Sequence, residues 1–120
     1  MATVLIVEDS PTDQHHFKTV LEKGGYQVET LDDGSRCLER TRELKPDAVL
    51  MDVVMPGMNG FEATRQLARD SETANIPVIM ITTKDQETDK VWGLRQGARD
   101  YLTKPVGEKD LTEAIRKAIG

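Results

Sequence analysis

Three acids, a hydroxyl and an amine each come at the end of a short apolar segment of the chain. These groups are Glu8, Asp9, Asp52, Thr82 and Lys104. Carboxylates held close together repel one another unless a cation lies among them, and all-oxygen ligands favour a hard cation, Mg²⁺ or Mn²⁺. A cation, a hydroxyl and an ammonium together can neutralise phosphoryl oxygens, so a carboxylate among them can become an aspartyl phosphate.

The segments that must position these groups are continuously apolar rather than alternating with polar residues. The strongest runs are residues 4–7, 48–51 and 78–81, with weaker strands at 26–31 and 101–102. A strand that is apolar on both faces is buried on both faces, as in a parallel sheet covered by helices. The pattern therefore predicts five buried strands.

Helix-length amphipathic stretches separate these strands. Ser10 can cap the first helix, Pro11 suits its first position, and Asp13 stands where a capping box has an acid. Gly24 ends this helix, and Pro46 ends the second. The residues predicted to face the sheet are Phe17, Val20 and Leu21; Cys37, Leu38 and Thr41; Phe61, Thr64, Leu67 and Ala68; Val91, Leu94 and Ala98; and Leu111, Ala114, Ile115 and Ala118.

The order of elements is a strand followed by a helix, repeated five times. Such alternation predicts an α/β fold, with a doubly wound five-stranded parallel sheet between two layers of helices. Ligands of open parallel sheets bind beyond the carboxyl ends of the strands. The three acids, Thr82 and Lys104 are therefore expected at one edge of the sheet.

The length, net charge and cysteine count of the chain exclude several classes of function. The 120 residues suit one domain, residues 1–120, with no linker and no output domain. The net charge of −5 lacks the basic footprint of a nucleic-acid binder. One cysteine, Cys37, fits a reducing, cytoplasmic compartment, and the sequence shows neither a leader pattern nor an apolar run long enough to enter a membrane.

Four stretches of the chain carry a family resemblance through their order and spacing. They are residues 4–10 (VLIVEDS), 49–60 (VLMDVVMPGMNG), 77–82 (PVIMIT) and 97–105 (GARDYLTKP). In these stretches the chain resembles the CheY-like receiver domains of bacterial two-component response regulators. The resemblance implies a flavodoxin-like, three-layer sandwich with strand order 2-1-3-4-5.

The resemblance also implies a metal site and a phosphoacceptor. Asp52 matches the aspartate that is phosphorylated, and Asp9 matches a direct Mg²⁺ ligand. Glu8 matches a second acid that acts through water, and the backbone carbonyl of Val54 matches the remaining protein ligand. Mn²⁺ is expected to substitute for Mg²⁺.

Four further positions match the switch machinery of the family. Thr82 matches the switch hydroxyl, and Lys104 matches the lysine that contacts the phosphoryl group. Tyr101 matches the aromatic residue that swings inward when the hydroxyl turns toward the phosphoryl group. The bond before Pro105 is expected to be cis.

A more specific resemblance lies in residues 83–93, which look like the receivers of type IV pilus (twitching motility) chemosensory systems, the PilH-like group. The implied function is a single-domain response regulator that takes a phosphoryl group from a histidine kinase or a histidine phosphotransfer domain. The face made by the fourth helix, fifth strand and fifth helix, including Trp92 and Tyr101, would then bind a downstream protein. A monomer or a weak, phosphorylation-dependent dimer is expected.

Two other function classes stay open at this point. The chain could be an unphosphorylated interaction scaffold with a receiver fold, although the full set of acids, Thr82 and Lys104 argues against it. It could be a phosphatase of the haloacid-dehalogenase type, but that chemistry needs a second acid two residues after the nucleophile. Val54 stands there, so the chain is expected to be a signalling protein rather than an enzyme.

Overall fold

The computed structural model describes residues 1–120, and every predicted strand and helix is present. The strands are β1 (Thr3–Val7), β2 (Gln27–Leu31), β3 (Ala48–Met51), β4 (Val78–Thr82) and β5 (Asp100–Thr103). The helices are α1 (Pro11–Lys23), α2 (Cys37–Leu44), α3 (Gly60–Arg69), α4 (Glu87–Gln96) and α5 (Glu108–Ile119), with a 3₁₀ turn, η1, at Gly34–Arg36. No helix combines the length and the apolar character that crossing a bilayer requires.

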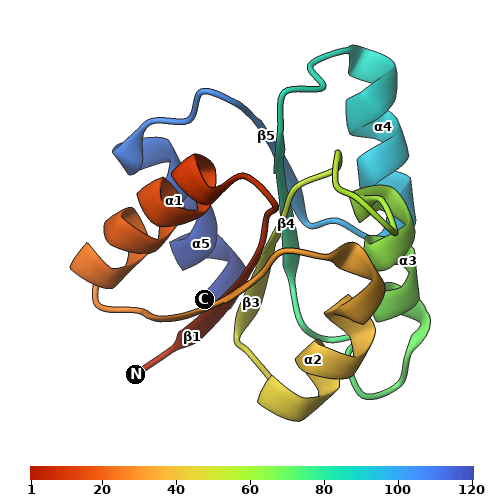
Figure 1. The fold of residues 1–120 in the computed structure, drawn as a ribbon, viewed down its shortest axis with the longest axis horizontal. Coiled ribbons are helices and arrows are strands. Elements are labelled where there is room, and N and C mark those ends of the chain that lie inside the picture. The colour runs from red at the N-terminus through yellow and green to blue at the C-terminus, as the bar shows by residue number, and fades with distance from the viewer.

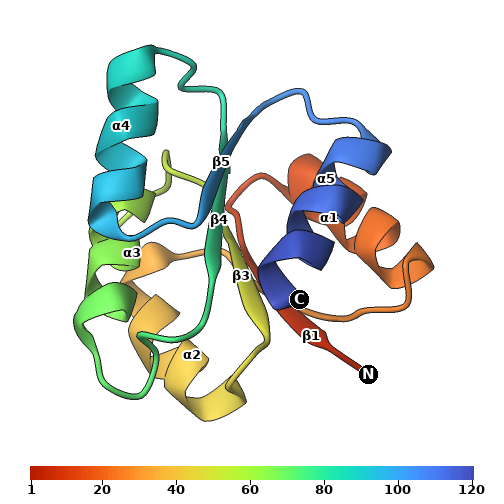
Figure 2. The same cartoon turned by 180° about the vertical axis from the view of Figure 1, so that it is seen from behind.

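The five strands form one parallel sheet in the order β2-β1-β3-β4-β5. Helices α1 and α5 cover one face of the sheet, and α2, α3 and α4 cover the other (Figures 1 and 2). This arrangement confirms the predicted α/β, flavodoxin-like sandwich of three layers. All strands end at the same edge, which places the residues that follow β1, β3, β4 and β5 side by side.

The core is divided between the two faces of the sheet because successive strand residues point to opposite sides. In β1, Val4 and Ile6 pack with Phe17 and Leu21 of α1 and with Ile115 of α5. On the opposite face, a second cluster joins β1 and β3 to the inner sides of α2 and α3. Its buried members include Leu5, Val7, Val49, Met51, Cys37, Ala63 and Leu67.

The cap of α1 differs in part from the prediction. The hydroxyl Oγ of Ser10 accepts a hydrogen bond from the backbone N–H of Asp13 at 3.3 Å, as an N-cap does. The carboxylate of Asp13 does not close a capping box. It instead accepts a hydrogen bond from the ammonium of Lys104, because the loop after β5 brings that charge within reach.

The predicted inner face of α4 is wrong at Val91 and Leu94, whereas the third predicted residue, Ala98, is buried just beyond the end of the helix. Val91 and Leu94 are each 43% exposed, and the only buried residue of the helix is Gly93. A methyl group on Gly93 would meet the side chains of Met80 and Tyr101 at 2.7 and 2.9 Å. The helix therefore rests on the sheet through its glycine, which turns its larger apolar side chains outward. Ala68 at the end of α3 is likewise exposed.

Candidate functional site

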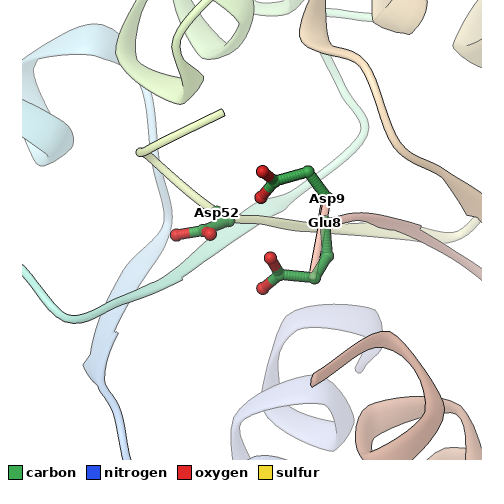
Figure 3. Close-up of side chains that lie close together, drawn as sticks. All are labelled: Glu8, Asp9 and Asp52. Atoms are coloured by element: carbon green, nitrogen blue, oxygen red, sulfur yellow. The ribbon is translucent and has the colours of Figure 1, made fainter. Parts of the chain in front are cut away.

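The acidic site is built by the ends of two neighbouring strands, β1 and β3. Val7 pairs with Met51, and the backbone N–H of Asp52 donates to the carbonyl of Val7 at 3.0 Å. The chain leaves both strands at this point, so Glu8, Asp9 and Asp52 follow side by side. Their carboxylate groups gather in one place (Figure 3), with one oxygen from each lying within 4.8 Å of the others.

This donor set fits the Mg²⁺ that the sequence predicts. Glu8 and Asp52 are 1% and 5% exposed, whereas Asp9 is open to solvent. The ligands are all carboxylate oxygens, and Mg²⁺ prefers a few such oxygens together with several of its own waters. The exposed side of the cluster at Asp9 leaves room for those waters.

Lys104 supplies the positive charge of the site. Its ammonium Nζ donates to Glu8 Oε1 at 2.7 Å, to Asp13 Oδ2 at 2.8 Å and to Asp52 Oδ2 at 3.4 Å. Its ammonium Nζ lies over the ring of Phe17, 5.8 Å from the ring centroid. Burial lowers the pKa of Lys104, but the hydrogen bonds to Asp13 and Glu8 and the charge of Asp52 outweigh it and raise that pKa.

Glu8 is the acid whose protonation the site changes most. Burial raises the pKa of Glu8 to about 7, although hydrogen bonds from Lys104 and from the backbone N–H of Ser10 lower it in part. Asp52 adds to the increase because its hydrogen-bonded carboxyl and its negative charge disfavour a second anion nearby. The cluster thus carries negative charge that the ammonium of Lys104 only partly offsets.

Thr82 and Tyr101 are joined through the backbone of one residue, Lys84. The Lys84 N–H donates to Oγ1 of the fully buried Thr82 at 3.3 Å. The Tyr101 hydroxyl donates to the Lys84 carbonyl at 2.8 Å, and its ring is buried against Val53 and Met80. Burial, with the nearby acids, raises the pKa of Tyr101 to about 12, so its hydroxyl keeps the proton that it donates.

The structure gathers most of the predicted site residues but not all of them. Lys104 is tied to β4 as well, since its backbone N–H donates to the carbonyl of Thr82 at 2.8 Å, and the bond before Pro105 is cis. The Val54 side chain is 59% exposed and turned away from the core. Trp92, which was expected on the partner-binding face, is 49% exposed and lines a surface hollow between α3 and α4.

Asp13 is the residue of this site that sequence reasoning missed. An acid in the first turn of a helix is ordinarily explained by capping. From the sequence alone, Asp13 was therefore not considered as a partner of Lys104. The useful signal would have been that α1 begins four residues after β1 ends. Its first turn therefore has to lie above the same edge of the sheet as the acids.

Comparison with known proteins agrees with the fold and the site. Residues 4–116 match the family described as the response regulator receiver domain, so the chain belongs to this family. It is 59% identical to protein PilH of Pseudomonas aeruginosa over 119 residues, which cover 99% of this chain and 98% of that one. It is 40% identical to the DNA-binding response regulator MtrA of Mycolicibacterium smegmatis over 97% of this chain, but spans only 50% of that longer protein.

Solved structures give the same result. The chemotaxis protein CheY4 of Vibrio cholerae superposes with a TM-score of 0.91 at 32% identity, over 98% of both chains. The receiver domain of a sensor histidine kinase from Pseudomonas aeruginosa superposes with a TM-score of 0.92 at 30% identity, over 99% of this chain and 98% of that one. That structure holds a magnesium ion in its active-site cleft.

The family membership defines the class of function. The chain is a receiver domain of a two-component response regulator, close to PilH and CheY-like in fold. Receiver domains bind Mg²⁺ at an acidic pocket, and histidine kinases phosphorylate them so that they act on downstream targets. The chain is therefore a signalling protein rather than a conventional enzyme.

Proposed function

We propose that Asp52 is the phosphoacceptor of this response regulator receiver domain. The observation that carries this proposal is the position of Asp52, which is 5% exposed, shares a carboxylate cluster with Glu8 and Asp9, and lies 3.4 Å from the ammonium of Lys104. Glu8 is buried as well and accepts from the same ammonium at 2.7 Å, so the resemblance of residues 49–60 to the receiver motif is what selects Asp52 between the two buried acids. The donor is a histidine kinase or a histidine phosphotransfer domain.

Glu8, Asp9 and Asp52, with the backbone carbonyl of Val54, form the proposed magnesium site. The metal supplies charge neutralisation for the phosphoryl oxygens when it is bound. The family resemblance assigns Asp9 as a direct ligand and Glu8 as an acid that acts through water; in the structure Asp9 is open to solvent and Glu8 is buried. Mn²⁺ is expected to support the same reaction, since it accepts the same oxygen ligands.

The transfer step requires a carboxylate nucleophile and positive charge on the incoming group. An Asp52 carboxylate oxygen forms a bond to phosphorus while the bond between phosphorus and the donor's imidazole nitrogen breaks, and that nitrogen keeps the electron pair. The Lys104 ammonium and the Thr82 hydroxyl then contact phosphoryl oxygens. Lys104 already lies within hydrogen-bond distance of Asp52, which supports its role.

The switch would run from Thr82 to Tyr101 through Lys84. When the Thr82 hydroxyl turns toward the phosphoryl group, it loses its bond from the Lys84 N–H, and the Lys84 carbonyl that holds Tyr101 moves with it. The face of α4, β5 and α5 then changes its preference for a downstream protein. Trp92 offers that partner a half-exposed aromatic side chain, and the protein is a monomer or a weak, phosphorylation-dependent dimer.

The process we infer is control of type IV pilus twitching motility or related chemotaxis-like signalling in the cytoplasm. Its support is the 59% identity to PilH across nearly the whole of both chains. This chain covers 98% of the length of that relative. The buried Cys37 thiol, whose pKa burial raises to about 11, needs no oxidising compartment.

The decisive experiment is intact-mass spectrometry after incubation with acetyl phosphate. The wild type should gain one phosphoryl group only when Mg²⁺ is present, and Asp52→Asn should gain none. Asp9→Asn should lose the Mg²⁺ dependence together with most of the product. A wild type that gains no phosphoryl group and fails to bind beryllofluoride would instead support an unphosphorylated scaffold.

A further inference from the structure

Asp13 lies outside the carboxylate cluster, yet it holds the lysine of the site. Its Oδ2 is 2.8 Å from the Lys104 ammonium, while the nearest oxygen of Asp52 is 3.4 Å from the same nitrogen. The ammonium is thus closer to Asp13 on α1 than to the carboxylate that the proposed function phosphorylates. The side chain of Lys104 is 13% exposed, so these carboxylates are its main surroundings.

The position of Asp13 is fixed by the beginning of a helix rather than by a flexible loop. Ser10 caps the backbone N–H of Asp13, and Pro11 begins α1 two residues before it. One turn later Phe17 is buried against the sheet and lies beneath the ammonium. The Asp13 carboxylate is 37% exposed, so water solvates it and it stays apart from the buried acids.

We propose that Asp13 is a positioning residue that holds the Lys104 ammonium aside while the site takes up its metal ion. The inference rests on the proposed function of the cluster. Lys104 and a divalent cation compete for the same oxygens of Glu8 and Asp52, because the ammonium now contacts one oxygen of each. With Asp13 present, Lys104 keeps a charged partner when those oxygens turn to the metal.

Removing the charge of Asp13 has opposite effects on the two states of the site. In the metal-free state, the ammonium would pair with Glu8 and Asp52 alone, and the site would have one negative charge fewer, so Mg²⁺ would bind more weakly. With a phosphoryl group or its analogue on Asp52, the ammonium would no longer be shared with Asp13. The phosphoryl oxygens would then be held more tightly.

The test is the substitution Asp13→Asn, measured in two titrations. Calorimetry with Mg²⁺ alone should show weaker binding by about fivefold, the range expected for one partly exposed ion pair. Beryllofluoride binding at saturating Mg²⁺ should become tighter by a similar factor, with slower release. Asp13→Glu should keep both constants near the wild-type values, because it retains the carboxylate.

Asp110→Asn is the matched control. Asp110 is also the third residue of its helix, α5, and the substitution removes the same charge from the same kind of position, but Asp110 makes no contact with Lys104. It should change neither constant. A general structural defect would weaken both kinds of binding, so only opposite changes support the inference.

Two outcomes would overturn the inference, and they are distinguishable. A wild type that binds Mg²⁺ and beryllofluoride, with an Asp13→Asn variant that shifts neither constant or lowers both affinities, removes the role of Asp13 alone. A wild type that binds neither probe removes the proposed function and this inference with it.

Discussion

Gly93 of α4 lies directly against the ring of Tyr101. A methyl group on Gly93 would be 2.9 Å from ring atom Cδ2 of Tyr101 and 2.7 Å from the sulfur of Met80, both shorter than ordinary contacts of carbon. Because Gly93 has no side chain, the tyrosine ring can pack in the space that one would fill. Tyr101 is accordingly only 6% exposed. Its hydroxyl reaches the Lys84 carbonyl from this inward position.

Gly93→Ala should therefore displace the Tyr101 ring toward solvent. Alanine favours a helix interior by about 1 kcal/mol over glycine, so the helix itself should form at least as well. The chain has two tyrosines, and 3-fluorotyrosine labelling should give two ¹⁹F resonances. The Tyr101 signal should shift and gain a solvent isotope effect, while the Tyr26 signal stays in place.

Gly107→Ala is the control for this experiment, because a methyl group at Gly107 would have no neighbour within 4 Å. It should leave both resonances where they are. An unchanged Tyr101 resonance in Gly93→Ala would show that the ring does not depend on the glycine.

Gly34 packs closely against the loop that follows Asp52. A methyl group on Gly34 would overlap the backbone carbonyl oxygen of Met58, so the substitution Gly34→Ala has to push that loop aside. Overpacking of this kind costs about 1–3 kcal/mol of unfolding free energy. Because the loop also carries Val54, Mg²⁺ affinity should fall as well.

Urea denaturation and Mg²⁺ calorimetry of the Gly34→Ala variant measure the two effects. Gly107→Ala again provides the comparison, since its methyl group meets open space. Normal Mg²⁺ affinity in a destabilised Gly34→Ala variant would separate the loop's packing from the metal site.

Glu8 should make the metal-free protein less stable as the pH rises. Its pKa is about 7 in the folded chain against an ordinary value of 4.5, so the folded state binds more protons between these values. Unfolding free energy should therefore fall from about pH 4.5 to about pH 7 and then level off. Mg²⁺ affinity should rise over the same window, because the metal requires the ionised carboxylate.

Thermal unfolding without metal and calorimetry with Mg²⁺, each from pH 5 to pH 8, measure this dependence. The Glu8→Gln variant has no carboxyl proton to release at this position. Its stability and its Mg²⁺ affinity should therefore both change less with pH than those of the wild type. A wild type with the same profile as Glu8→Gln would mean that Glu8 is ionised throughout.

The strands and most of the site were predictable because they depend on local pattern and sheet geometry. Continuous apolar runs such as β3, repeated in alternation with helix-length segments, are typical of a covered parallel sheet, and the ends of parallel strands meet at one edge. That is enough to bring Asp52 beside Glu8 and Asp9. The family resemblance, rather than this geometry, supplied their expected roles.

The features that were not predictable depend on the placement of one element against another. The carboxylate of Asp13 satisfies a helix-start pattern, and only the approach of the loop after β5 turns it toward Lys104. The inner face of α4 was mistaken because apolar spacing pointed to Val91 and Leu94, whereas the close approach of Tyr101 requires Gly93 on that side. The contact between Asp13 and Lys104 and the buried face of α4 each depend on a second element, so the pattern of one helix alone does not predict them.

Two leucines on neighbouring helices distinguish the observed face of α4 from the one that spacing favoured. Leu67 of α3 is 1% exposed and Leu94 of α4 is 43% exposed. Leu67→Ala should cost about 2–5 kcal/mol of unfolding free energy, because it leaves a cavity in the core. Leu94→Ala should stay within about 0.5 kcal/mol of the wild type, as surface substitutions do. Urea denaturation of both variants measures the difference, and equal losses would mean that Leu94 is packed in solution.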